Sequence, residues 1–233
     1  MPDNINKIIN FFLPGNCYLC HALLENNEKC LCQTCAGKFK PLVNTCKLCA
    51  SPLWDNASVI CGNCINHPPV WQQAIVPFAY SGATGFLLKE LKFNRGLGIS
   101  SQLSRLFLKA LKTRTSKLPD MIIPVPLHRA KLARRGFNQT YELSNIIGKE
   151  LKIPIATNIC YRAKNTISQT GLNHDERRKN LSKAFVLERP ELIRNKHIVL
   201  FDDVYTTGAT LNALAKICRI AKRIDVWCIA KTT

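Results

Sequence analysis

Two neighbouring aspartates followed by hydroxyl-bearing residues are the first feature of this sequence that could support chemistry. Residues 197–210 read HIVLFDDVYTTGAT, so an apolar run leads into Asp202 and Asp203. A helix that begins just after this run would present unpaired backbone N–H groups and the positive end of its dipole to a phosphate. A glycine in the turn would let the ligand approach the backbone closely. The residues predicted to hold this phosphate are Val204, Thr206, Thr207, Gly208, Ala209 and Thr210.

The aspartates require a different partner, because their negative charges repel a phosphate. Two adjacent carboxylates can accept hydrogen bonds from the two neighbouring hydroxyls of a ribose, or they can face a cation. The stretch therefore suits a ribose 5-phosphate. It is not a Walker A loop, since the G-x-x-x-x-G-K-[ST] pattern does not occur. The alternative is that the aspartates merely end a strand while Thr207 caps a helix. We favour the interpretation as a ligand site, because two carboxylates beside a buried strand cost free energy unless they bind a partner.

A second chemical feature is a set of four Cys-x-x-Cys pairs near the N-terminus. The pattern C-x2-C-x11-C-x2-C occurs twice, at an offset of 29 residues. Eight thiolates suffice for two tetrahedral zinc ions, and four thiolates leave no open position for water, so the zinc is predicted to be structural. Sequential and cross-braced pairings both satisfy the spacing, and a redox or disulfide set is the alternative to metal. The predicted ligands are Cys17, Cys20, Cys32, Cys35, Cys46, Cys49, Cys61 and Cys64.

Four further cysteines fall outside this repeat. Cys30 has Val59 as its counterpart at the 29-residue offset, so we interpret it as a spectator thiol. Cys160, Cys218 and Cys228 lie in apolar surroundings and are predicted to be small core residues.

Positive charge is distributed unevenly along the chain. The net charge is +18, of which residues 1–70 contribute +1 and residues 71–233 contribute +17. A solvated face is the ordinary interpretation of one basic cluster, but this excess is more than solubility requires and indicates a polyanionic partner. The residues that we predict to contact nucleic acid are Arg129, Lys131, Arg134, Arg135, Arg177, Arg178 and Lys179.

The elements that must position these residues alternate between strands and helices. This order predicts an α/β domain with a mostly parallel sheet, in which ligands bind beyond the carboxyl ends of the strands. We expect a zinc-binding module over 1–70, a prolyl linker, and the α/β domain over 71–233. No apolar run approaches the length of a membrane span, and the N-terminus lacks the features of a signal peptide, so we expect a cytoplasmic protein without membrane insertion.

Individual elements follow from periodicity. Strands are expected over 72–80, 120–126, 197–203 and 225–231, helices over 84–94, 99–113, 140–152 and 206–222, and a basic loop over 127–139. Phe86, Leu87 and Leu91 are expected on the apolar side of the first helix.

The sequence also resembles a known family. VLFDDVYTTGAT (199–210) is similar to the phosphoribosyl-pyrophosphate (PRPP) motif of type I phosphoribosyltransferases. The whole chain resembles the ComF family of competence-associated proteins, also called GntX-like. The resemblance rests on the cysteine pairs, LKFNR (91–95), PVPLHRAKLARRGFNQ (124–139) and QTGLNHDERRKNLSKAF (169–185). The elements RGFNQ and R-x-x-N-x-x-x-AF are specific to that family, whereas the PRPP motif alone identifies only the superfamily.

This resemblance implies a site and a role. Leu127, His128 and Arg129 would bind pyrophosphate, Mg²⁺ would accompany PRPP, and Asp202 and Asp203 would be the catalytic pair if a transfer occurs. A role in natural transformation is implied, with PRPP and single-stranded DNA as ligands and other competence or DNA-processing proteins as partners. The segment PVPLH departs from the family of metabolic enzymes in lacking a glycine, which puts a standard transfer reaction in doubt. The alternatives are a nucleobase-salvage phosphoribosyltransferase and a PRPP-sensing module without catalysis.

Overall fold

The computed structural model of the protein describes residues 15–24, 30–55, 57–94, 97–115, 117–163 and 184–232. Within these residues, no helix has the length and apolar character needed to cross a bilayer.

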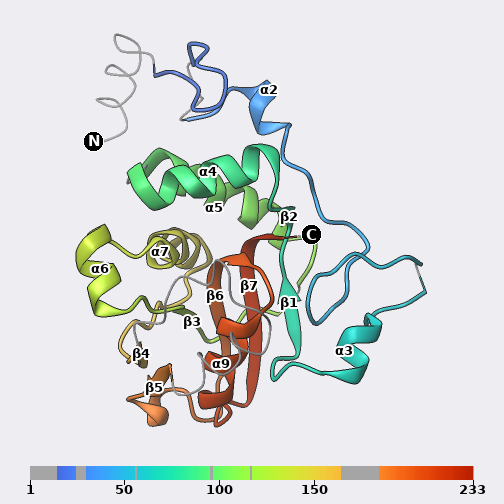
Figure 1. Cartoon of the computed structure of the whole chain (residues 1–233). Helices are drawn as coiled ribbons and strands as arrows, with labels where there is room; N and C mark the ends of the chain where they lie inside the picture. The colour runs from blue at the N-terminus through green and yellow to red at the C-terminus, as the bar shows by residue number, and fades with distance from the viewer. Residues whose placement is uncertain are drawn as a thin grey trace.

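A parallel sheet forms the centre of the molecule (Figure 1). Its strands follow the order β1 (Gln73–Ile75), β7 (Arg223–Lys231), β6 (His197–Tyr205) and β3 (Met121–Pro124), all parallel. The short β2 (Phe78–Ala79) also pairs with β7. Strands β6 and β7 are buried along nearly their whole length, as expected for parallel strands covered on both faces. The predicted α/β class with a mostly parallel sheet is confirmed.

Helices cover both faces of this sheet. Alternate residues of β6 separate the two sides: Val199 and Phe201 pack with the apolar residues of α4 (Gly82–Asn94), α5 (Leu97–Leu111) and α7 (Gln139–Leu151). Figure 1 shows these three helices on one side of the sheet. On the other side, Ile198 and Leu200 pack with α9 (Ala209–Ile217). The antiparallel pair β4 (Cys160–Arg162) and β5 (Phe185–Leu187) and a 3-10 turn, η1 (Pro190–Leu192), complete the domain.

Two local predictions were wrong. Phe86 was expected on the apolar side of α4 but is 44% exposed. Leu88 takes that position and is buried together with Leu87 and Leu91, because α4 turns a slightly different stripe of residues toward the sheet. The expected basic loop contains a helix, α6 (Arg129–Arg135). The ring of His128 accepts a hydrogen bond from the N–H of Ala130 and caps this helix, and Gly136 ends it with φ 76°.

Part of the cysteine-rich region lies along one edge of the sheet. The short helices α2 (Gln33–Ala36) and α3 (Gly62–Asn66) each begin directly after the third cysteine of a set. Between them, the backbone of residues 40–47 hydrogen-bonds to the strand region 74–79: the N–H of Leu42 donates to the carbonyl of Pro77 and that of Ala79 to Lys40. The segment therefore covers the edge formed by β1 and β2.

Candidate functional site

Asp202 and Asp203 lie near the carboxyl end of the central strand β6, which continues to Tyr205. The Asp203 carboxylate is buried, and its Oδ2 lies 3.2 Å from Nζ of Lys92 on α4. Gln139, at the start of α7, donates a hydrogen bond of 3.3 Å from Nε2 to the same oxygen. Two helices on one face of the sheet thus fix Asp203 through a cation and an amide.

Asp202 has a different environment. It is partly exposed, and its Oδ1 accepts a hydrogen bond of 2.9 Å from the backbone N–H of Asp203. Desolvation and the charge of Asp203 raise the pKa of Asp202 well above its usual value. Such a carboxylate gains from any ligand that donates hydrogen bonds or brings positive charge. Because Asp202 is also the less buried of the two aspartates, it is the member of the pair that a ligand could reach.

The turn after β6 contains a glycine in the left-handed conformation. Gly208 adopts φ 74° and caps α9, and an added Cβ there would meet the Tyr205 hydroxyl at 2.4 Å. Thr206 and Thr207 are exposed. Thr207 Oγ1 accepts a 3.3 Å hydrogen bond from the N–H of Ala209, the first residue of α9. A phosphate bound at this helix terminus would share or replace that contact.

A chain of side-chain contacts joins the acid pair to α6. The Arg135 guanidinium donates to Oε1 of Gln139, and Gln139 in turn donates to Asp203. Arg135 is half-buried, whereas Arg129 and Arg134 are exposed. Arg135 therefore supports the acid pair through Gln139, in addition to its predicted place in a nucleic-acid surface.

Two contributors to the site, Lys92 and Gln139, were missed by the sequence reasoning. Both lie inside segments that carry the family resemblance, LKFNR and RGFNQ. Their place in these two segments was the only sequence feature that could have indicated a role, since nothing in their spacing relates them to Asp203.

The other residues predicted to contact nucleic acid or pyrophosphate lie on or beside α6, except for three outside the described residues. Burial and the charges of Arg162, Arg134 and Arg135 lower the pKa of Lys131, which indicates a concentrated positive potential at α6. Leu127 and His128 precede this helix, and His128 pairs with Arg162 through a parallel bridge. The predicted contacts Arg177, Arg178 and Lys179 lie outside the described residues.

The cysteine pairs assemble into two separate clusters. Each cluster combines two consecutive Cys-x-x-Cys pairs, and within each the four Sγ atoms lie within 4.8 Å of one another. The pairing is therefore sequential rather than cross-braced. Cys20 Sγ and Cys32 Sγ are 3.7 Å apart, and Cys49 Sγ and Cys61 Sγ are 3.6 Å apart. Four sulfurs bound to zinc at about 2.3 Å would be separated by about 3.8 Å, so both clusters fit a tetrahedral zinc ion.

The other cysteines behave as expected. Burial and the charge of Cys17 raise the pKa of Cys30 to about 11, which suits a spectator thiol beside the first cluster. Burial likewise raises the pKa of Cys160 and of Cys218 to about 12. Cys228 is fully buried in the core.

The second cluster lies near Tyr205, the residue that precedes the turn at Gly208, since burial and the charges of Cys49, Cys64 and Cys46 raise the Tyr205 pKa. Cys46, Cys49 and Cys64 belong to the apolar cluster that contains Trp71 and Tyr205. The rings of Trp71 and Tyr205 meet edge to face, with centroids 6.3 Å apart. The second cysteine cluster and Tyr205, whose ring lies next to Gly208, therefore share one apolar core.

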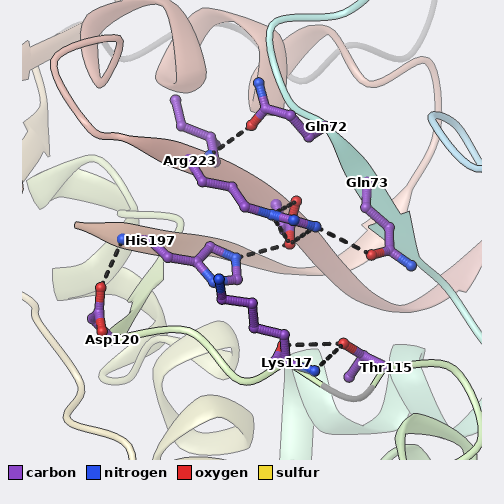
Figure 2. A network of polar contacts seen from close by, with 9 residues as sticks. Gln72, Gln73, Thr115, Lys117, Asp120, His197 and Arg223 are labelled. Atoms are coloured by element: carbon purple, nitrogen blue, oxygen red, sulfur yellow. Dashed lines mark hydrogen bonds and ion pairs between the residues drawn. The ribbon is translucent and has the colours of Figure 1, made fainter. Parts of the chain in front are cut away.

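A second polar network lies at the opposite end of the same strands (Figure 2). His197 Nε2 lies 2.8 Å from Oδ2 of Asp225, and Arg223 donates to both oxygens of that carboxylate. The backbone N–H of His197 donates to Asp120, and Arg223 also reaches Gln73. Because it joins the starts of β3, β6, β7 and β1, we interpret this network as a structural tie of the sheet.

Comparisons with known proteins match both parts of the chain. A double zinc ribbon domain matches residues 8–65. The DNA utilization protein YhgH of Escherichia coli O157:H7 is 34% identical over 94% of this chain and 98% of its own length. Competence protein F of Haemophilus influenzae is 35% identical over 96% of this chain and 100% of its own length. Competence protein ComFC of Bacillus subtilis is 27% identical over 86% of this chain and 81% of its own length.

Among solved structures, glutamine PRPP amidotransferase from B. subtilis aligns with 57% of this chain and 27% of its own chain. Its sequence identity to this protein is 15%, and the TM-score is 0.37.

Proposed function

Because this chain belongs to the ComF family, together with competence protein F and the DNA utilization protein YhgH, we propose that it binds PRPP and single-stranded DNA in the use of incoming DNA. PRPP would occupy the carboxyl end of β6, and DNA would bind the basic surface around α6. The zinc ribbons are structural in this proposal, and Mg²⁺ enters with PRPP as part of the ligand.

The observation that carries the PRPP proposal is the pairing of an anchored acid with an accessible one, directly before a glycine turn. Asp203 is fixed by Lys92 and Gln139, so the strand end keeps its shape without a ligand. Asp202 and the Asp203 oxygens would accept the ribose hydroxyls. The turn 206–210 would take the 5-phosphate through the start of α9.

The pyrophosphate of PRPP would lie toward the basic residues that precede α7. His128 and Arg129 begin α6, and Arg162 on β4 pairs with His128 through the backbone. Burial lowers the pKa of Arg162, and the nearby negative charge of Asp202 acts in the opposite direction. Arg162 is therefore close enough to Asp202 to interact with it. A magnesium ion carried by the pyrophosphate would offset the negative charge that Asp202 and Asp203 add to the site.

DNA binding is supported by the basic surface. Arg129 and Arg134 are exposed on α6, and Lys131 already lies in a strongly positive environment. Contacts of this kind are made with phosphates and carry little sequence preference. The net charge of +17 over residues 71–233 agrees with a partner larger than one PRPP molecule.

Isothermal titration calorimetry with PRPP and Mg²⁺ tests the first half of the proposal. The wild type should bind, and the variant Asp202→Ala/Asp203→Ala should not. Asp225→Asn is a suitable control, because it alters a carboxylate at the other end of the sheet. Equal PRPP affinity in the wild type and the double variant would contradict the site.

Titration with a labelled oligothymidylate at several salt concentrations tests the second half. The logarithm of the binding constant should fall linearly with the logarithm of salt concentration. Replacing Arg129, Lys131 and Arg134 with alanine should reduce the slope by about 2, at roughly 0.7 per lost contact with a single strand. A slope that does not change with these substitutions would place the DNA elsewhere.

A further inference from the structure

A cavity of about 520 Å³ lies on the outer side of α7, apart from the acid pair. One wall is a stripe of that helix: Tyr141, Asn145 and Lys149 follow one another at intervals of four residues and therefore share a face. The opposite wall is the chain that follows the helix, from Lys152 to Thr157. None of the residues that the structure places around this cavity is acidic.

The cavity is built into the fold rather than formed by loose side chains. Ile153 donates its N–H to the carbonyl of Gly148 at 2.8 Å, and an added Cβ on Gly148 would lie 2.5 Å from Cδ1 of Ile155. The wall is then tied to the sheet, since Ile122 on β3 donates to the carbonyl of Pro154 and accepts from the N–H of Ala156. Glycine at 148 thus lets the wall pack closely against the helix and gives the cavity an apolar floor.

The chemistry of the lining separates into two ends. Tyr141, 37% exposed, and Asn145 offer an aromatic face and an amide toward the first half of α7. Lys149 and Lys152 offer two exposed ammonium groups at its last turn. The eight helical steps from Tyr141 to Lys149 correspond to about 12 Å along the helix. An aromatic face beside cations is the arrangement with which proteins hold the bases and phosphates of single strands.

The cavity also continues the basic surface of α6. Only residues 136–138 separate the two helices, and this junction is fixed: Asn138 caps α7 by accepting from the N–H of Thr140 and donates to the carbonyl of Val125. Tyr141 lies in the first turn of α7, directly after the junction. Cations therefore precede the aromatic side chain on α6 and follow it at the end of α7.

We propose that this cavity on α7 is a nucleotide subsite for single-stranded nucleic acid, with a base against Tyr141 and the neighbouring phosphates on Lys149 and Lys152. The inference rests on the proposed DNA binding and extends it, because it adds a site with base stacking to a surface of phosphate contacts. A strand leaving α6 would run along α7 toward Lys152. The occupant is a strand rather than a free nucleotide, because the cations flank the aromatic residue on both sides.

The test compares a 20-residue oligothymidylate with an abasic strand of the same length, by fluorescence anisotropy at fixed salt. Tyr141→Ala should weaken oligothymidylate binding on the order of tenfold and leave the abasic strand unaffected. Tyr141→Phe should restore most of the affinity, because it keeps the ring. Lys149→Ala/Lys152→Ala should weaken both strands and lower the salt slope by about 1.4.

The matched control is Lys216→Ala/Lys222→Ala, which removes the same charge from exposed positions on the α9 side of the sheet. If the wild type binds the oligonucleotide while the Tyr141 and Lys149/Lys152 variants bind it equally well, the α7 subsite is wrong and the α6 surface stands. Absence of wild-type binding to either strand at low salt would instead reject the proposed DNA binding, and this subsite with it. A thymidine monophosphate that competes as well as the strand would also overturn the inference.

Discussion

The ammonium of Lys231 lies 4.1 Å from the centroid of the Tyr205 ring, and both residues are buried. Tyr205 packs in the same apolar cluster as Cys46, Cys49 and Cys64. A zinc ion with four thiolates has a net charge of −2, so a buried cation beside it is electrostatically favourable. The contact therefore links the second metal cluster, through Tyr205, to the turn at Gly208.

Loss of the second zinc should weaken PRPP binding more than loss of the first. Cys64→Ser removes a ligand from the cluster that packs against Tyr205, whereas Cys35→Ser removes one from the cluster that does not. Metal analysis should give one zinc per chain for either variant and two for the wild type. Calorimetry should show reduced PRPP affinity for Cys64→Ser only. Equal affinity in both variants would contradict the link.

Gly208→Ala should destabilise the turn by about 2 kcal/mol, because a left-handed conformation strains alanine and its Cβ would meet the Tyr205 hydroxyl at 2.4 Å. Chemical denaturation measures this change. The cost should shrink in a Tyr205→Phe background, where that hydroxyl is absent. Gly85→Ala is the control: its Cβ would have no neighbour nearer than 3.8 Å, and alanine favours a helix by up to about 1 kcal/mol.

Asp202→Asn should stabilise the ligand-free protein at neutral pH. Burial and repulsion raise the pKa of Asp202 in the folded state, so its ionisation destabilises the fold once the pH exceeds the unfolded pKa of about 3.9. The gain in melting temperature should be largest near pH 7 and vanish as the pH approaches 4. The same variant should lose PRPP affinity. A melting temperature that is unchanged or lower at pH 7 would refute the prediction.

Asp225→Asn should have the opposite effect on stability. This carboxylate accepts from Arg223 and lies 2.8 Å from His197, so an amide removes the negative charge that pairs with Arg223 and weakens a buried polar network. We expect a loss of about 2–4 kcal/mol in unfolding free energy and unchanged PRPP affinity in the folded fraction. Reduced affinity would show that this network influences the ligand site.

The extent of successful prediction differed between local and long-range features. The cysteine spacing predicted two four-thiolate sites, because a gap of two residues lets both sulfurs of a pair bind one metal ion and two pairs complete a tetrahedral site. The run HIVLFDD indicated a buried strand, since only a strand covered on both faces is so continuously apolar. The contact of Lys92 with Asp203 joins residues 111 positions apart, and only the packing of α4 on the sheet could reveal it. The helix α6 was missed, because its basic residues suggest exposure and hide its capping by His128.

The segment that joins the two zinc ribbons carries one more consequence. Residues 40–47 hydrogen-bond along β1 and β2 and so protect the outermost strands of the sheet from other chains. Because metal holds both ends of this segment, a zinc-starved cell would accumulate protein with an uncovered strand ready to pair with its neighbours. Insoluble material, rather than a merely inactive protein, would then be the first sign of metal deficiency.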